Sequence, residues 1–309
     1  MTRARVPSLA TRFVRYLPAP LLASGLVVVM ALSTTLFAVL LYPLIAIKVI
    51  ARHPALMRSM EQLLVVAAKA WIDVNSALLS LTQSTVWVVD GLEKLPGDGR
   101  YLVVVNHVTA SDILVLQRVL NRRIPFLKFF LKSQLIWVPL LGPLWWALDF
   151  PFMKRHSREM LEKHPELRAD DLETTRRRCA RFRDHAVSIL SFAEGTRFTT
   201  TKHDQQQSPY THLLRPKVGG IAFVLDAMHG ALDALVDVTL VYADPHPTLW
   251  RFLGGKIPKL TVDITVRPIP PTLGGGDYVG DAAYRAALQQ WIGELWRNKD
   301  ERIAAIRAT

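Results

Sequence analysis

The chain has 309 residues, half of them hydrophobic, and its 38 Lys and Arg against 26 Asp and Glu give a formal net charge of +12. That charge favours an anionic partner, either a phospholipid surface or a phosphorylated substrate, and because no nucleic-acid recognition motif accompanies it we expect no nucleic-acid partner. The single cysteine, Cys179, excludes an intrachain disulfide and fits a reducing compartment, and no residues show the spacing of metal ligands.

A long apolar run, residues 21–50, has its first charge at Lys48 and is long enough to cross a bilayer once, which takes about 20 residues. It exceeds the roughly 7–15 residues of a signal-peptide core, so we expect a retained membrane anchor. Pro43 is expected to end or kink its helix. Basic residues flank the run at positions 3, 5, 12 and 15 and at positions 48, 52 and 58. The positive-inside rule therefore leaves one span and a re-entrant hairpin both open.

Beyond the anchor, helical and strand patterns alternate. Helical patterns cover residues 54–81, 112–120 and 170–186, a helix is expected to start near residue 217, and an amphipathic helix lies beyond residue 282. Residues 85–107 read as strand, turn, strand, and further strands are expected at residues 187–192, 235–242 and 259–269. This alternation implies an α/β domain with a largely parallel or mixed sheet.

The stretch "VVVNHVTASDILVL" places His107 and Asp112 where a buried strand gives way to a helix. On one regular helix their side chains would point about 140° apart. They meet only if His107 lies in the turn and Asp112 in the first helical turn, with Ser111 as a plausible N-cap. Asp112 would then accept the Nδ1 hydrogen and leave Nε2 free to take a proton. The alternative is that Asp112 only places a favourable negative charge at the start of the helix and that His107 is a surface loop residue.

No nucleophile accompanies this pair, since the sequence has no Gly-x-Ser-x-Gly elbow. A second polar block, "SFAEGTRF", follows the strand at 187–192 and carries a glycine for close backbone approach and an arginine whose fork suits phosphate. By itself this block could be a surface turn with an exposed ion pair. Arg155 ends an apolar, aromatic segment, residues 132–155, whose prolines and glycine favour an interfacial element or a groove wall. Taken without the other motifs, Arg155 is interpreted as a solvated charge beside a membrane-facing segment.

Four blocks together resemble glycerolipid acyltransferases, the lysophosphatidic acid acyltransferase family. "NHVTASD" matches the Asn-His-x4-Asp block, and "FAEGTR" matches the Phe-Pro-Glu-Gly-Thr-Arg block with Ala193 in place of proline. "KSQLIWVPLLG" and "FPFMKR" resemble the intervening block, with Gln134 where glutamate is frequent, and "VTLVY" occupies the place of the fourth. The resemblance covers residues 86–242, and "FMKRHSRE" and "ETTRRRC" look close to a bacterial inner-membrane subgroup.

The resemblance implies a mixed sheet flanked by helices, of the glycerolipid-acyltransferase kind, with an N-terminal membrane-anchoring helical segment. We expect residues 1–60 to form the basic N-terminus and anchor and residues 61–309 the acyltransferase domain. The protein would lie at the cell inner membrane with its active site facing the cytoplasm. Its partners would be the phospholipid membrane, a lysophospholipid acceptor, and acyl-CoA or acyl carrier protein as the acyl donor, with no other cofactor and no metal.

The family roles transfer residue by residue. His107 becomes the general base and Asp112 its orienting partner, and no acyl-enzyme forms. The residues that correspond to the acceptor-binding blocks are Arg155, Glu194, Gly195, Thr196 and Arg197. The acceptor is expected to be 1-acylglycerol 3-phosphate. The alternatives are another lysophospholipid headgroup, a lipid or thioester hydrolase that uses the same pair to activate water, and a non-catalytic membrane protein that binds anionic lipids.

Overall fold

The computed structural model describes residues 18–50, 53–95, 97–153, 182–183 and 185–309. Its centre is a six-stranded sheet with the strand order β1-β8-β7-β2-β6-β3. The strands are β1 (Val86–Asp90), β2 (Arg100–Val105), β3 (Leu127–Phe129), β6 (Val187–Phe192), β7 (Ala234–Tyr242) and β8 (Lys259–Arg267). Every neighbouring pair is parallel except β7 and β8. The expected mixed sheet is confirmed, but β1 and β2, successive in the chain, are separated by β8 and β7.

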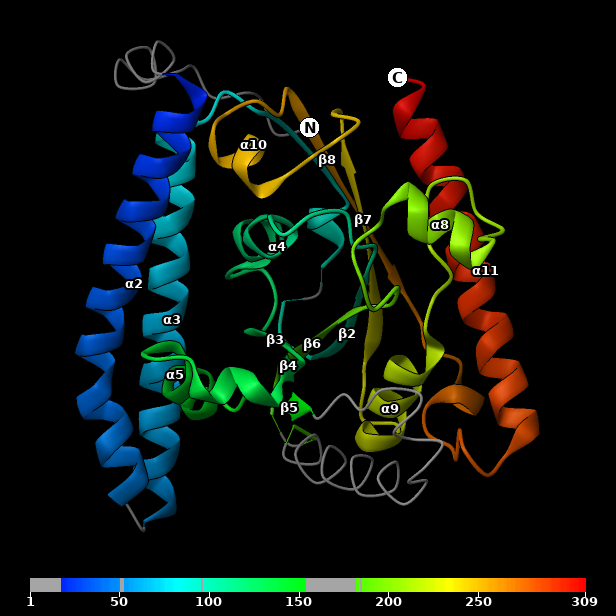
Figure 1. Ribbon diagram of the computed structural model, residues 1–309. Helices are drawn as coiled ribbons and strands as arrows, with labels where there is room; N and C mark the ends of the chain where they lie inside the picture. Colours follow the sequence, from blue (N-terminus) through cyan, green and yellow to red (C-terminus); the bar gives the residue numbers. More distant parts are fainter. Residues whose placement is uncertain (1–17, 51–52, 96, 154–181, 184) are drawn as a thin grey trace.

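Helices cover both faces of the sheet, which explains why its central strands are apolar at nearly every position (Figure 1). On one face, Val103 and Val105 of β2 belong to a core cluster with α4 (Asp112–Leu120). On the other, Leu102 and Val104 pack in a cluster with α9 (Val218–Met228) and α11 (Ala282–Arg307). The predicted helices at residues 112–120 and beyond residue 282 are confirmed, and α9 begins one residue after Lys217.

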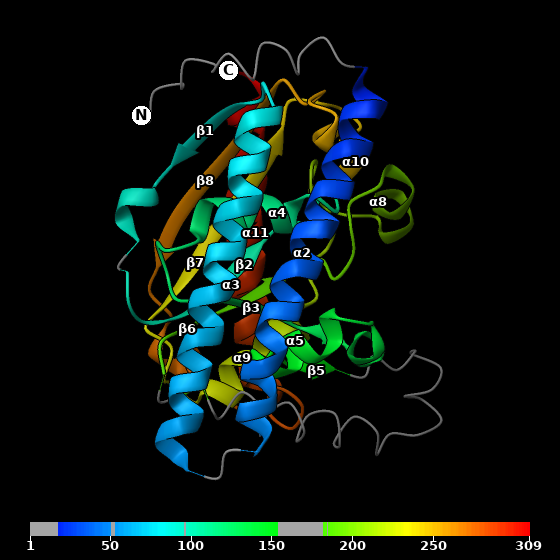
Figure 2. The same cartoon turned by 90° about the vertical axis from the view of Figure 1, so that its left-hand side faces the viewer.

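Two long helices, α2 (Ala19–Ile50) and α3 (Pro54–Thr82), lie side by side along one flank of the molecule (Figures 1 and 2). Both are long and apolar enough to cross a membrane by length and composition. Of the two effects expected of Pro43, the end of the helix is not found, because α2 continues to Ile50, and the kink stays a prediction. Ala38, Leu41 and Ile45 are buried in one cluster with residues of α3, and this packing holds the turns around the proline. The helix α3 runs without a break through residue 60, where the anchor region was expected to end and the acyltransferase domain to begin.

Both ends of α2 contact the globular part of the chain. At the N-terminal end, a Cβ added to Gly254, just after α10 (Leu249–Leu253), would lie 2.9 Å from the carbonyl oxygen of Ala19. At the C-terminal end, Lys48 Nζ donates to the carbonyl of Ala147, which ends α5 (Leu141–Ala147), at 2.7 Å. Figure 1 shows α10 near the upper end of the hairpin and α5 beside its lower half. The sheet domain is thereby fixed alongside α2 over most of its length.

The segment from residue 131 to residue 153 is broken into short elements, as its prolines and glycine predicted. They are β4 (Leu131–Lys132), η2 (Ser133–Trp137), α5 and β5 (Phe152–Met153). Leu144, Leu148 and Phe150 pack in the cluster that contains the C-terminal half of α2, whereas Trp137 is 83% exposed. The remaining short elements, α8 (Thr200–Gln206), α10, η1 (Leu92–Lys94) and η3 (Pro271–Leu273), were not predicted. Most of the helix expected at residues 170–186 lies outside the described residues.

Candidate active site

The sheet topology brings the two polar blocks together. Strands β2 and β6 are parallel neighbours in a register that pairs Val105 with Phe192, so both blocks leave the sheet at the same edge. The backbone N–H of Phe198 donates to the carbonyl of His107 at 2.8 Å, joining the second block to the first. The His107 ring also stacks on the Phe192 ring, with centroids 4.0 Å apart and planes 17° apart. This edge is where open α/β sheets bind their ligands.

The carboxylate of Asp112 accepts four hydrogen bonds. His107 lies in the turn and Asp112 begins α4, as the spacing predicted, and His107 Nδ1 lies 2.9 Å from Asp112 Oδ2. The same oxygen accepts the backbone N–H groups of Val108 at 2.7 Å and Thr109 at 3.0 Å. The other oxygen accepts the hydroxyl of Tyr242 at 2.7 Å. When the carboxylate is ionised and the imidazole neutral, Asp112 can only accept, so Nδ1 donates its hydrogen and Nε2 keeps a lone pair.

The expected capping role of Ser111 is not found. Ser111 occupies the N-cap position of α4 in a right-handed helical conformation, and its side chain makes no capping hydrogen bond. The carboxylate of Asp112 instead holds the backbone of the preceding turn through Val108 and Thr109. The turn geometry and the histidine orientation therefore depend on the same side chain, which is fully buried, whereas the His107 side chain is 18% exposed.

Glu194 lies inside the protein beneath the site, with 1% of its surface exposed. Burial raises the pKa of its carboxyl group to about 8, and the charge of Asp112 contributes to the rise. The backbone amides of His107 and Leu214 and the charge of Lys299 oppose the rise, but neither carboxyl oxygen has a hydrogen-bond partner within the described residues. The Glu194 side chain is therefore enclosed by protein and not presented at the surface of the turn.

The turn that follows carries the other predicted residues. Gly195 has a left-handed backbone, with φ at +67°, and its N–H donates to the carbonyl of Phe192 at 2.9 Å. Thr196 accepts a hydrogen bond from Lys202 Nζ at 2.8 Å. The side chain of Arg197 is exposed and makes no ion pair within the described part of the chain. Arg155 lies outside the described residues, so its predicted place at the site stays a prediction.

Two contributors were not assigned roles from the sequence, Tyr242 and Asn106. Tyr242 ends β7, in the block expected to be merely hydrophobic, and its hydroxyl reaches Asp112. The side chain of Asn106 bridges β2 to β7 by donating to the carbonyl of Leu240 at 3.0 Å and accepting its N–H at 2.9 Å. The sequence signal for both residues was only that a polar side chain ends an apolar strand. It could not show that they act together, because the adjacency of β2 and β7 is a property of the tertiary structure.

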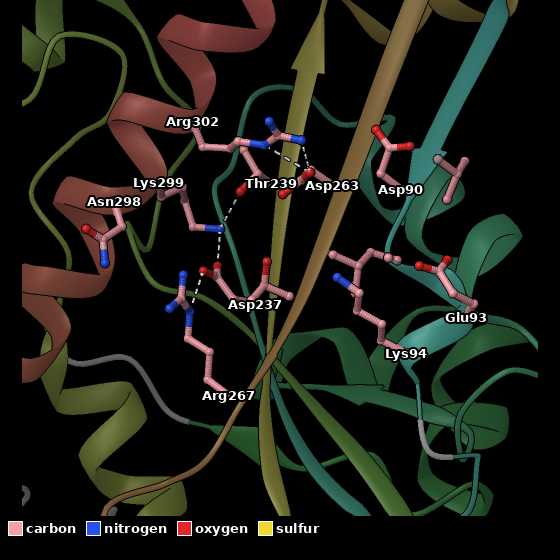
Figure 3. Close-up of a pocket in the computed structure, with 14 residues that line it drawn as sticks. Asp90, Glu93, Lys94, Asp237, Thr239, Asp263, Arg267, Asn298, Lys299 and Arg302 are labelled. Carbon is pink, nitrogen blue, oxygen red and sulfur yellow. Dashed lines mark hydrogen bonds and ion pairs between the residues drawn. The ribbon is translucent and has the colours of Figure 1, made fainter. Parts of the chain in front are cut away.

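A cavity of about 520 Å³ lies elsewhere, between α11 and strands β1, β7 and β8 (Figure 3). Its inner charges are already paired, with Asp237 held 2.5 Å from Lys299 Nζ and 3.2 Å from Arg267 Nε. Arg302 forms an ion pair with Asp263. None of its lining residues belongs to the His107 or Arg197 blocks, so this cavity is separate from the candidate active site. Within the described ranges, no group of three His, Cys, Asp or Glu side chains gathers as metal ligands would.

Comparison with known proteins identifies the family of the chain. The sequence model of the acyltransferase family matches residues 87–243, about half of the chain. Mouse 1-acyl-sn-glycerol-3-phosphate acyltransferase gamma is 28% identical over 234 residues, which cover 72% of this chain and 57% of the mouse protein. Zebrafish lysocardiolipin acyltransferase 1 is 28% identical over 258 residues, which cover 75% of this chain and 59% of the zebrafish protein. The chain thus spans under three fifths of the length of these relatives.

A solved structure shares the fold. The 1-acyl-sn-glycerophosphate (LPA) acyltransferase PlsC from Thermotoga maritima superposes with a TM-score of 0.50 over 89% of this chain and 98% of its own, at 14% sequence identity. At that identity the likeness concerns the fold alone. The family match covers the strands from β1 to β7 and both polar blocks, and it confirms the resemblance drawn from the four sequence blocks. The chain belongs to the acyltransferase family.

Proposed function

We propose that this protein transfers a fatty acyl group from a thioester to the free hydroxyl of a lysophospholipid, with 1-acylglycerol 3-phosphate as the preferred acceptor and phosphatidic acid as the product. The observation that carries the proposal is the placement of the His107–Asp112 pair, 2.9 Å apart, at the sheet edge where Arg197 also leaves the sheet. The names of the mouse and zebrafish relatives, which concern acylglycerol phosphate and a lysophospholipid, support this choice of acceptor.

The chemistry follows from the histidine tautomer. Nε2 of His107 takes the proton from the acceptor hydroxyl as its oxygen attacks the thioester carbonyl carbon. The carbon–sulfur bond then breaks, the imidazolium returns the proton to the leaving thiolate, and the products are an ester and a free thiol. Asp112 holds the ring and stabilises the positive charge that His107 carries between these steps. No covalent acyl-enzyme is formed, in keeping with a site built around a base.

The acyl donor is proposed to be acyl-CoA or acyl carrier protein, with no further cofactor. Both donors present an anionic phosphopantetheine arm, which suits a chain of net charge +12. We place the enzyme at the inner membrane with its site facing the cytoplasm. The single cysteine in the sequence is consistent with that reducing compartment.

The anchor is proposed to lie along the membrane surface. The helix α2 has 32 residues and is therefore about 48 Å long, whereas the hydrocarbon core is about 30 Å thick. Because both ends of α2 contact the globular part, an upright α2 would carry the sheet domain into hydrocarbon. An apolar stripe instead faces outward along its length, formed by Val28, Leu32, Leu36 and Val39. An in-plane helix embeds this stripe and keeps the site within reach of lysolipids.

The test is an acceptor panel on the purified full-length enzyme in lipid vesicles. Labelled acyl-CoA and acyl carrier protein are each offered with lysophosphatidic acid, other lysophospholipids, glycerol 3-phosphate or no acceptor. We expect label in phosphatidic acid, and we expect His107→Ala to abolish it while membrane association and the melting temperature stay near those of the wild type. Thioester consumption at the same rate without any acceptor would refute acyl transfer and identify a hydrolase.

A further inference from the structure

The side chain of Lys217 lies against Gly195 in the turn after β6. A Cβ added to Gly195 would stand 3.0 Å from Lys217 Cδ and 3.5 Å from its Nζ. The backbone N–H of Lys217 also donates to the carbonyl of Ala193 at 2.6 Å. Both the backbone and the side chain of this lysine are therefore fixed beside the Glu-Gly-Thr-Arg turn, although 22 positions separate it from Gly195 in the sequence.

Four lysines and arginines lie between residues 195 and 217, and they divide into two kinds. Lys202 Nζ is held by Thr196 Oγ1 at 2.8 Å and the carbonyl of Arg197 at 3.1 Å. Arg215 donates to two backbone carbonyls at the end of α8, at 2.9 and 2.7 Å. Arg197 and Lys217 are exposed, and their charged groups have no partner within the described residues. Two cations thus remain available at one turn.

The start of α9 adds to the positive potential there. Lys217 is the N-cap residue of α9, and its side chain makes no capping hydrogen bond. The first backbone N–H groups of the helix therefore have no hydrogen bond from the N-cap side chain. Gly219 and Gly220 follow in the first turn, and a Cβ added to Gly219 would meet nothing within 4 Å. The positive end of the helix dipole therefore lies beside the lysine and reinforces its attraction for an anion.

We propose that Lys217 is a second phosphate-binding residue for the acceptor, acting together with Arg197. This inference rests on the proposed function and deepens it. A phosphate monoester carries between one and two negative charges near pH 7, since its second pKa is about 6. One guanidinium neutralises only part of that charge, whereas a guanidinium and an ammonium match it. The glycine at position 195 gives the lysine room to lie across the turn.

The proposal predicts selectivity between headgroups. A lysophospholipid with a phosphodiester headgroup, such as lysophosphatidylglycerol, carries one charge on its phosphate, which Arg197 can neutralise without help. Lysophosphatidic acid, a monoester, uses both cations. Lys217 therefore makes the enzyme bind the monoester more tightly than the diester. Without this lysine, the difference in KM between the two acceptors should become smaller.

The experiment compares wild type, Lys217→Gln and Lys217→Arg with both acceptors on vesicles. We expect Lys217→Gln to raise KM for lysophosphatidic acid about tenfold, the effect of one charge-assisted contact, with kcat within about threefold of the wild type. KM for lysophosphatidylglycerol should change less than about twofold. Lys217→Arg should restore most of the affinity for lysophosphatidic acid because it keeps the charge. The diester rate of Lys217→Gln reports within the same protein that the fold is intact.

A matched control is Lys94→Gln, which removes one exposed charge from η1 at the rim of the separate cavity in Figure 3 and should leave both acceptor KM values unchanged. Equal losses with both acceptors, or an unchanged KM for lysophosphatidic acid, would overturn the role of Lys217 while leaving the proposed function standing. A wild-type enzyme that transfers to other acceptors but not to lysophosphatidic acid would overturn both.

Discussion

At the scale of single residues, the site depends on how completely Asp112 is hydrogen-bonded. Its two oxygens accept hydrogen bonds from the histidine, two backbone amides and a tyrosine, so the carboxylate orients the His107 ring and shapes the turn that holds it. The tyrosine comes from β7, 130 positions away in the sequence. Tyr242 therefore acts on the orientation of His107 through Asp112.

Tyr242→Phe should lower kcat several-fold without changing the acceptor KM, because Tyr242 reaches Asp112 and not the substrate. The loss of one buried hydrogen bond should also cost about 1–2 kcal/mol of stability. Tyr101→Phe is the matched control, since the buried Tyr101 donates instead to the carbonyl of Asp98. Steady-state kinetics and thermal unfolding measure both effects, and a kcat that falls equally in the two variants would contradict the positioning role.

Glu194→Gln should remove a pH dependence of stability. The pKa of Glu194 rises from 4.5 to about 8 on folding, so the folded state holds a proton that the unfolded state releases. Stability from this group is present below pH 4.5 and is lost as the pH rises toward 8, by about 1.4 kcal/mol for each unit of pKa shift. Melting temperatures from pH 5 to 8 should therefore fall more steeply for the wild type than for the variant. Glu301→Gln, on the exposed face of α11, should follow the wild-type profile.

At the scale of elements, the contacts of Lys48 fasten the α2–α3 hairpin to the α5 segment. Its Nζ donates to the carbonyl of Ala147 and forms ion pairs with Glu61 of α3 at 3.1 Å and Asp149 at 3.3 Å. The lysine side chain is only 11% exposed. Lys48, the first charge in the apolar run, therefore links α2 to α3 and to the α5 segment.

Lys48→Met should destabilise the protein by about 1–2 kcal/mol, because it removes the cation that two partly exposed carboxylates share. It should also make the hairpin easier to cleave by protease. Both are measurable in detergent by thermal unfolding and limited proteolysis. Lys256→Met removes an exposed lysine and serves as the control. A Lys48→Met variant as stable and as resistant as that control would show that the link contributes nothing.

At the scale of the whole molecule, the position of the globular part beside the hairpin determines how the enzyme can meet a bilayer. The contacts at Ala19 and Lys48 are 29 residues apart along α2, about 44 Å at 1.5 Å per residue. The proposed orientation along the surface embeds the apolar stripe and leaves the polar sheet edges in water.

Spin labels placed singly at positions 21, 32 and 50 of α2, in a Cys179→Ser background, test this orientation. All three residues are exposed apolar side chains, Leu21, Leu32 and Ile50. An in-plane helix places the three labels at similar shallow depths in the bilayer. A spanning helix would place the label at position 32 near the bilayer centre and the others toward opposite surfaces, and that depth profile would refute the in-plane proposal.

The sequence by itself determined the longer elements and that His107 and Asp112 could meet. Apolar periodicity marked the central strands and the long helices, because burial on both faces of a sheet or on one face of a helix leaves a local pattern. The spacing of His107 and Asp112 already required a strand-to-helix junction, which β2 and α4 supply. The ordered blocks from residue 86 to residue 242 indicated the family, and the family match confirmed it.

The tertiary structure decided what depends on neighbours that are distant in the sequence. Strand order placed β7 beside β2, and only then could Tyr242 reach Asp112. Folding buried Glu194, which its place in a polar turn gave no reason to expect, and laid Lys217 across Gly195. Packing carried α2 through Pro43 and fixed both its ends to the domain. Local patterns cannot report these features, because each is a contact between residues whose separation in the chain leaves no periodic trace.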